Sequence, residues 1–321
     1  MATNTDSVRP RSANAMTAIA VVPILPLCFA LACGSQMAVL SPSTTVASST
    51  GSPVTTIANA GFALPENIVY DSLADVYLIS NINGGARAKD ANGFISRVAA
   101  DGRVLQLKWI DGSRAETRLD GPKGIAINGD TIAVADVGAV RFFNTRTGAS
   151  LGVRTLPGEL MNDVAFGKDG SVYVTDTGPD AGKPDSADHD AIYRLYPDGR
   201  TVTIARSADL AGPDGIVVTD SGVVYATFKG HVIEAIAGSG ARRTVMNMPG
   251  GRDDGLRLLP DGSYVVTSWD TKTVYRMQDG GTLLPVLTGV TSPAGVALDT
   301  RRQTLAVTSM QDNKLYLLPL R

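Results

Sequence analysis

Six positions along this chain carry the residues that could do chemistry, because each lies at the same place in a repeated motif. They comprise three carboxylates, an amide, a lysine and an alanine: Glu66, Asp214, Asp254, Asn162, Lys123 and Ala294. Carboxylate and amide oxygens without nitrogen or sulfur ligands suit a hard divalent cation, most naturally Ca²⁺ and less readily Mg²⁺ or Mn²⁺. Whether these side chains can share one ion depends on the elements that carry them.

The motif itself is four residues long and opens an apolar strand. Its copies span residues 65–68, 122–125, 161–164, 213–216, 253–256 and 293–296. In the third copy, residues 163–166 are followed by an Asp-Gly turn at 168–170 and a second apolar run at 171–175. Alternating apolar runs separated by such turns are typical of β-hairpins. Two further strand-like runs follow, so each repeat holds four strands.

Repeats of roughly 40 residues with four strands apiece are typical of a β-propeller. We therefore predict an all-β fold, a six-bladed β-propeller with four-stranded blades. The sixth copy has only three strands after Pro293. We expect residues 53–58, an N-terminal strand, to supply the fourth and close the ring, which leaves no open sheet edge.

This fold brings the six motif positions together, because the first strand of each propeller blade starts near the central axis. Carboxylates gathered in a confined channel repel one another unless a cation compensates them. A divalent ion would do so, with Lys123 to one side. The alternative is that each Asp or Asn only bonds the backbone of its own turn, as these residues often do.

At these residues the sequence resembles the six-bladed senescence-marker-protein-30/gluconolactonase group, with related calcium propellers such as paraoxonase and diisopropyl fluorophosphatase. The resemblance covers the chain from about residue 60 to its end. That family binds a catalytic divalent metal through a Glu before the first blade and Asn or Asp before the third, fourth and fifth. The resemblance thus implies Glu66, Asn162, Asp214 and Asp254 as metal ligands.

The resemblance also implies a hydrolase that acts on a lactone or related ester. Asp254 would serve as general base or nucleophile. Lys123 would stabilise the developing oxyanion or simply neutralise the ring. The blades, with Asp136 and Asp176 ending second strands, also look like NHL-repeat propellers, many of which are binding scaffolds. A non-catalytic propeller that binds a ligand or protein, with a structural metal or none, is therefore the alternative function.

Two long loops join second to third strands and are expected on the same face as the metal. They span 81–93, with Asn81 and Asn83, and 177–190, with His189. Long loops above a site often set specificity, so these residues are candidates for a substrate lid.

Composition excludes several functions. Only two histidines, His189 and His231, occur, which leaves no basis for a His-rich zinc site or a Ser-His-Asp triad. The formal net charge is −2 and no basic run stands out, so nucleic acid is not an expected partner. We expect a monomer that acts on a small-molecule substrate.

Residues 1–33 resemble an export signal, with Arg9 and Arg11 before an apolar run that is short for a membrane span. Residues 29–34 resemble a bacterial lipobox, so Cys33 is a candidate for lipidation, with plain secretion as the alternative. Residues 34–56 are rich in Ser, Thr and Pro and predict a flexible tether to a propeller domain at 57–321. We expect an exported protein of the bacterial cell envelope, anchored to the membrane only through its N-terminal lipid.

Overall fold

The computed structural model describes residues 46–49, 51–158, 160–179, 190–278 and 281–320. All of these residues belong to one compact unit, Thr44–Arg321. Within these residues the only helical elements are two short 3₁₀ turns, η1 (Ala115–Thr117) and η2 (Ala208–Leu210). No helix of the described part is long and apolar enough to cross a membrane. The rest of the regular structure is β.

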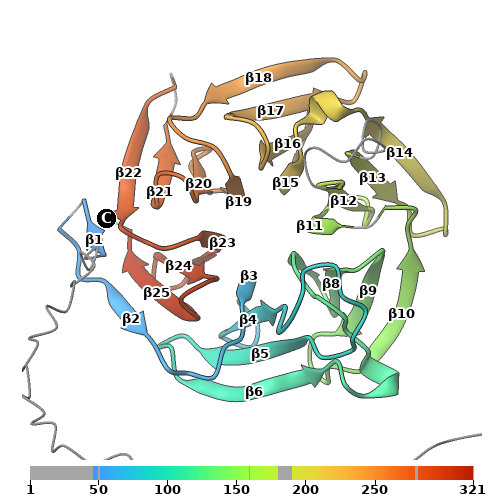
Figure 1. Ribbon diagram of the computed structural model, residues 1–321, viewed down its shortest axis with the longest axis horizontal. Coiled ribbons are helices and arrows are strands. Elements are labelled where there is room, and N and C mark those ends of the chain that lie inside the picture. The colour runs from blue at the N-terminus through green and yellow to red at the C-terminus, as the bar shows by residue number, and fades with distance from the viewer. Residues whose placement is uncertain (1–45, 50, 159, 180–189, 279–280, 321) are drawn as a thin grey trace, which may run out of the picture. The chain divides into compact units, whose positions relative to one another are not determined.

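Antiparallel sheets form six blades arranged in a ring, numbered here in chain order (Figure 1). Blade 1 contains β3 (Pro65–Asp71), β4 (Val76–Asn81), β5 (Phe94–Ala99) and β6 (Val104–Asp111). Blade 2 contains β7 (Ile125–Asn128), β8 (Thr131–Asp136), β9 (Ala139–Asn144) and β10 (Ser150–Thr155). Blade 3 contains β11 (Met161–Phe166), β12 (Val172–Asp176), β13 (Ala191–Leu195) and β14 (Thr201–Arg206).

The second half of the ring repeats this order. Blade 4 contains β15 (Pro213–Thr219), β16 (Gly222–Thr227), β17 (Val232–Ala237) and β18 (Arg242–Asn247). Blade 5 contains β19 (Asp253–Leu258), β20 (Tyr264–Ser268), β21 (Thr273–Met277) and β22 (Leu283–Thr288). Blade 6 contains β23 (Pro293–Asp299), β24 (Thr304–Ser309) and β25 (Lys314–Pro319). The predicted six-bladed, all-β propeller is therefore confirmed.

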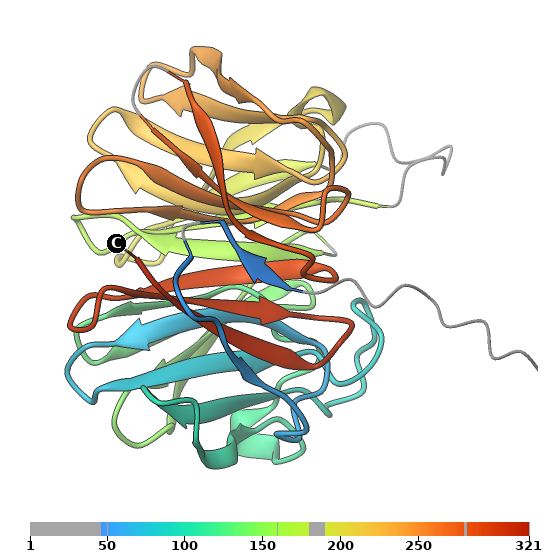
Figure 2. The ribbon, with the colours of Figure 1, turned by 90° about the vertical axis from the view of Figure 1, so that its left-hand side faces the viewer.

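The predicted N-terminal closure is also present. β2 (Thr55–Ile57) pairs with β25 and becomes the fourth strand of blade 6, where the blue N-terminal segment runs beside the red strands (Figure 2). The propeller begins before the expected boundary at residue 57, because β1 (Ala47–Ser48) also pairs with β22 at the edge of blade 5. Part of the segment predicted as a tether thus satisfies backbone groups that an open sheet edge would expose.

The core lies between the blades rather than at the centre of the ring. Six clusters of buried apolar residues occur, one at each interface between neighbouring blades. Alternating apolar residues of the strands form these layers, as the period-two pattern requires. This packing fixes the first strands β3, β7, β11, β15, β19 and β23 around the axis (Figure 1).

Candidate functional site

The six motif positions lie where the first strands begin. Glu66, Asn162, Asp214, Asp254 and Ala294 are each the second residue of a first strand, and Lys123 shortly precedes β7. The register of the first two strands shifts at this point in blades 1, 3, 4, 5 and 6. Such β-bulges redirect side chains, and here they accompany every ring position that carries a carboxylate or an amide.

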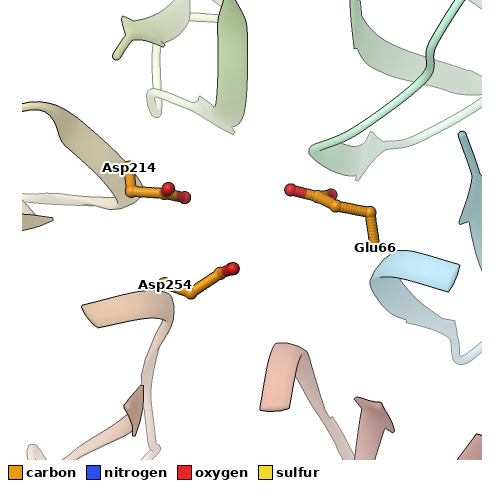
Figure 3. Close-up of side chains that lie close together, drawn as sticks. All are labelled: Glu66, Asp214 and Asp254. Atoms are coloured by element: carbon orange, nitrogen blue, oxygen red, sulfur yellow. The ribbon is translucent and has the colours of Figure 1, made fainter. Parts of the chain in front are cut away.

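Three of these side chains meet. The carboxylates of Glu66, Asp214 and Asp254 point toward a common centre (Figure 3), and each offers an oxygen within 4.8 Å of the other two. All three residues are buried, with relative exposures of 5%, 2% and 4%. Ca²⁺–oxygen distances are about 2.3–2.6 Å, so oxygens on opposite sides of one ion lie about 5 Å apart. The spacing of this cluster therefore fits a single divalent cation.

Asn162 lies directly beside this cluster. Its Nδ2 donates a hydrogen bond to Asp214 Oδ2 at 2.6 Å and another to Thr177 Oγ1 at 2.8 Å. Within the described structure, Asn162 Oδ1 and Glu66 Oε2 are buried without a hydrogen-bond partner. A buried oxygen without a partner costs free energy, and a cation would satisfy both atoms. The donor set is suited to a hard divalent ion.

Threonines on the second strands hold the backbone of these residues. Thr175 Oγ1 donates to the carbonyl of Asp214 at 2.7 Å, and Thr308 Oγ1 donates to that of Glu66 at 2.9 Å. Thr267 Oγ1 makes the equivalent bond to Ala294 at 2.8 Å. Each hydroxyl belongs to the preceding blade, so these bonds also join neighbouring blades at the axis.

Burial raises the pKa of all three clustered carboxyl groups. The pKa values of Glu66 and Asp214 lie well above their usual range, first because of burial and then because of the charge on Asp254. Burial raises the pKa of Asp254 to about 8, Asp163 adds to the rise, and the Trp269 N–H opposes it. At neutral pH these groups therefore hold protons unless a cation takes their place.

Lys123 is buried on the Glu66 side of the cluster, with a relative exposure of 2%. Its ammonium donates hydrogen bonds to the carbonyls of Ala86 at 2.8 Å and Gly121 at 2.9 Å. Burial lowers the pKa of Lys123, and the negative charge of Glu66 opposes that shift. One of its three N–H donors thus bonds the 81–93 loop, and a second bonds the segment that leads into β7.

Asp254 is oriented by Trp269, which packs against a second aromatic residue. The indole N–H of Trp269 donates to Asp254 Oδ2 at 3.0 Å. Phe228 packs edge-on against Trp269, with ring centroids 5.3 Å apart, and the Arg252 guanidinium lies 5.5 Å from the Trp269 ring. Trp269 is only half-buried, so it forms a wall beside the carboxylates.

The predicted lid residues differ in their placement. Asn81 is fully buried at the end of β4, where its Nδ2 donates to Ser96 Oγ at 3.0 Å and its Oδ1 accepts from the Ala63 N–H. Its side chain therefore stabilises blade 1 and does not contact a substrate above the ring. Asn83 lies in the loop, half-buried, and bonds the Asn92 carbonyl at 2.8 Å. His189 and Cys33 lie outside the described residues.

Two polar residues that the sequence analysis missed form a second layer below the carboxylates. Asn67 and Asp163 each follow a ring residue, and Asn67 Nδ2 donates to Asp163 Oδ1 at 3.1 Å. In the other four copies this place is glycine; a Cβ on Gly215, for example, would lie 2.3 Å from the Asp254 carbonyl oxygen. A comparison of the six motif copies at the position after the ring residue would have identified Asn67 and Asp163.

The fold and the ring define a class of protein, a six-bladed propeller with a cluster of buried carboxylates at its axis. The family model for the SMP-30/gluconolactonase/LRE-like region matches residues 98–311, which is more than half of the chain. The protein therefore belongs to this family, and the resemblance seen in the sequence is confirmed. None of the curated proteins matches the sequence.

Solved structures share the fold at low sequence identity. A gluconolactonase from Xanthomonas campestris is 20% identical, with a TM-score of 0.64 over 84% of this chain and 90% of its own. A luciferin-regenerating enzyme is 14% identical, with a TM-score of 0.64 over 84% and 96%. A streptogramin B lyase is 13% identical, with a TM-score of 0.58 over 84% and 98%. These likenesses concern the fold alone.

Proposed function

We propose that this protein is an exported, divalent-cation-dependent hydrolase that opens a lactone or related ester, with Ca²⁺ as the natural cation. The observation that carries the proposal is the cluster of Glu66, Asp214 and Asp254, whose oxygens lie within 4.8 Å of one another. Membership of a family that includes gluconolactonases, and a gluconolactonase among its structural neighbours, supports the lactone as substrate class.

The residues of the site fall into two groups, those that would bind the cation and those that would take part in proton transfer. Glu66, Asn162, Asp214 and Asp254 would bind the cation through their oxygens, two of which have no other partner among the described atoms. A cation held there polarises the carbonyl oxygen of the substrate and stabilises the charge that develops on it.

Asp254 is the candidate base. Its Oδ2 is fixed by Trp269, so the carboxylate keeps one orientation while it accepts a proton from the water that attacks the lactone carbonyl. The water oxygen bonds to the carbonyl carbon, the ring C–O bond breaks, and the leaving oxygen takes the proton back from Asp254, so the product is a hydroxy acid. Lys123, whose ammonium keeps one N–H beyond its two backbone bonds, stabilises the oxyanion or balances the charge of the ring.

Hydrolysis of a panel of lactones and esters tests this function. With Ca²⁺ present, we expect turnover that Asp254→Asn reduces by about 10²-fold or more. Asp220→Asn, which alters an exposed carboxylate paired with Lys168, is the matched control and should keep full activity. Tight cation binding without hydrolysis of any panel member would instead support a non-catalytic binding propeller.

Export, lipidation and a monomeric state also belong to this proposal. The basic residues, apolar run and small residues before Cys33 support a lipoprotein signal. Labelling of growing cells with a radioactive fatty acid should mark the wild-type protein and not Cys33→Ala. A labelled Cys33→Ala variant would contradict the anchor, and sedimentation of the purified protein tests the monomer.

A further inference from the structure

A single arginine breaks the pattern of the first strands. Three residues after the ring position, five blades carry a small apolar residue that packs between blades: Val69, Ala126, Ala165, Val217 and Ala297. Blade 5 carries Arg257 instead. An arginine side chain is much longer than the space that alanine or valine fills, so it extends beyond this layer.

Arg257 lines a cavity that runs along the propeller axis. The cavity has a volume of about 490 Å³, which lies within the range of small-molecule sites. Its inner end is formed by Asn67 and Asp163, below the carboxylate ring, and its outer end by the turns between first and second strands. The cavity therefore opens on the face opposite the proposed lactone site.

The walls of this cavity combine polar groups, among them the carboxylates of Asp71 and Asp163, with apolar side chains. The apolar side chains include those of Ile127, Phe166, Val217 and Leu258. Arg257 is the only cationic side chain among the lining residues. A ligand with one negative charge can pair with Arg257, and an apolar part of it can lie against these apolar side chains.

The guanidinium of Arg257 has no ion pair or hydrogen bond in the part of the chain that the structure describes. Burial lowers its pKa, and only the charge of Asp163 acts in the opposite direction. That carboxylate already accepts bonds from the N–H groups of Val164 and Ile216 and from Asn67. The five N–H donors of the Arg257 guanidinium are thus available to a ligand.

We propose that this axial cavity is a second binding site, which takes a small organic carboxylate. The carboxylate pairs with Arg257, for which the planar guanidinium offers two parallel N–H donors. The apolar body of the ligand lies against the walls and leaves water. The inference is independent of the proposed hydrolysis, because the Glu66, Asp214 and Asp254 carboxylates do not line the cavity.

Calorimetric titration with sodium hexanoate, at constant ionic strength, tests the site. Wild type should bind hexanoate, and Arg257→Val should weaken the affinity about 10- to 100-fold. Valine occupies the same position in blades 1 and 4, so this variant is compatible with the propeller. Arg257→Lys should retain part of the affinity, and neutral 1-hexanol should bind wild type about tenfold more weakly than hexanoate or worse.

A variant of the carboxylate ring separates the two sites. Glu66→Gln should leave hexanoate affinity within about twofold of wild type, because Glu66 does not line the cavity. Absence of hexanoate binding, equal binding of hexanoate and 1-hexanol, or unchanged affinity in Arg257→Val would overturn the proposal. If binding is lost in Glu66→Gln but kept in Arg257→Val, hexanoate occupies the carboxylate ring and the axial site does not exist.

Discussion

At the scale of residues, the carboxylate ring can be stabilised either by bound protons or by a bound cation. Glu66, Asp214 and Asp254 are buried at the axis with little positive charge except that of Lys123. Two buried oxygens of the ring residues, Glu66 Oε2 and Asn162 Oδ1, have no partner among the described atoms. Either protonation or a divalent ion relieves the repulsion between the carboxylates. The affinity of the site for a divalent cation should therefore depend on pH.

The sign of this pH dependence follows from the raised pKa values. Asp254 has a pKa of about 8 in the folded, cation-free protein, against about 4 in the unfolded chain. Its contribution to the free energy of unfolding is full below the unfolded value and is lost as pH rises toward 8. In EDTA, the melting temperature should fall between pH 5 and pH 8 (about the interval between these two values), and Ca²⁺ should remove most of that fall. A cation-free melting temperature that rises over this interval contradicts the assigned pKa shifts.

Trp269 is predicted to act on turnover rather than on cation binding. Trp269→Phe removes the N–H that fixes Asp254 Oδ2 but keeps an aromatic ring beside Phe228. We expect kcat to fall about tenfold while calcium content stays unchanged, because the base loses its orientation. Trp109→Phe, in blade 1 beside Arg97, is the control. Equal kinetics of the two variants would show that the indole does not position Asp254.

At the scale of elements, three of the blades hold the ring residue of the next blade in place. Second-strand threonines donate to the ring carbonyls of the following blade, and β-bulges turn the ring side chains inward. Asp136, at the end of β8, accepts hydrogen bonds from the N–H groups of Asp120 and Gly121 and pairs with Arg141. This aspartate anchors the start of blade 2, as expected of a turn-capping group.

Thr308 provides the test at this scale. Thr308→Val keeps the shape of the side chain but leaves the Glu66 carbonyl without the hydroxyl that now bonds it across the junction of blades 6 and 1. The free energy of unfolding should fall by about 1–3 kcal/mol, the cost of an unsatisfied buried acceptor. Denaturant titration measures it, with Thr203→Val on the exposed surface of β14 as control. Equal midpoints for both variants would contradict the role assigned to Thr308.

The repeated motif was sufficient to predict the blades and the ring, because each copy has the same place in its sheet. It could not predict the burial of Asn81, since a residue that ends a strand and a residue that begins a loop look alike in sequence. The pairing of Asn67 with Asp163 also escaped it, because that contact joins blades 1 and 3 across the axis. Arg257 was overlooked for another reason: only the structure reveals the cavity that it lines.

At the scale of the molecule, the ring is closed by the N-terminal strand. β2 pairs with β25 over Thr55–Ile57, so a strand near the start of the described chain and the last strand lie in the same sheet. Ile57 packs against the apolar cluster between blades 6 and 1. Closure of this kind removes an open edge and ties the two ends of the propeller together.

Two truncations measure this closure. A chain that begins at Ser52 loses only β1, whereas one that begins at Asn59 also loses β2. The longer deletion should lower the free energy of unfolding by about 2 kcal/mol or more. It removes Ile57, so the apolar residues that Ile57 covers and the edge of β25 become exposed. It should also promote aggregation through that edge. Identical unfolding curves and solubility for the two chains would show that β2 does not close the ring.

The most direct test of the central claim is a calorimetric titration of EDTA-treated protein with Ca²⁺, for wild type and for the double variant Glu66→Gln/Asp254→Asn. For wild type we predict one bound ion per chain, proton release at pH 7 and a rise in melting temperature, because the raised pKa values leave protons on the carboxylates. The double variant should show none of these effects. A wild-type protein that binds no divalent cation, or a double variant that binds it equally well, would contradict the assignment of the carboxylate ring as a cation site.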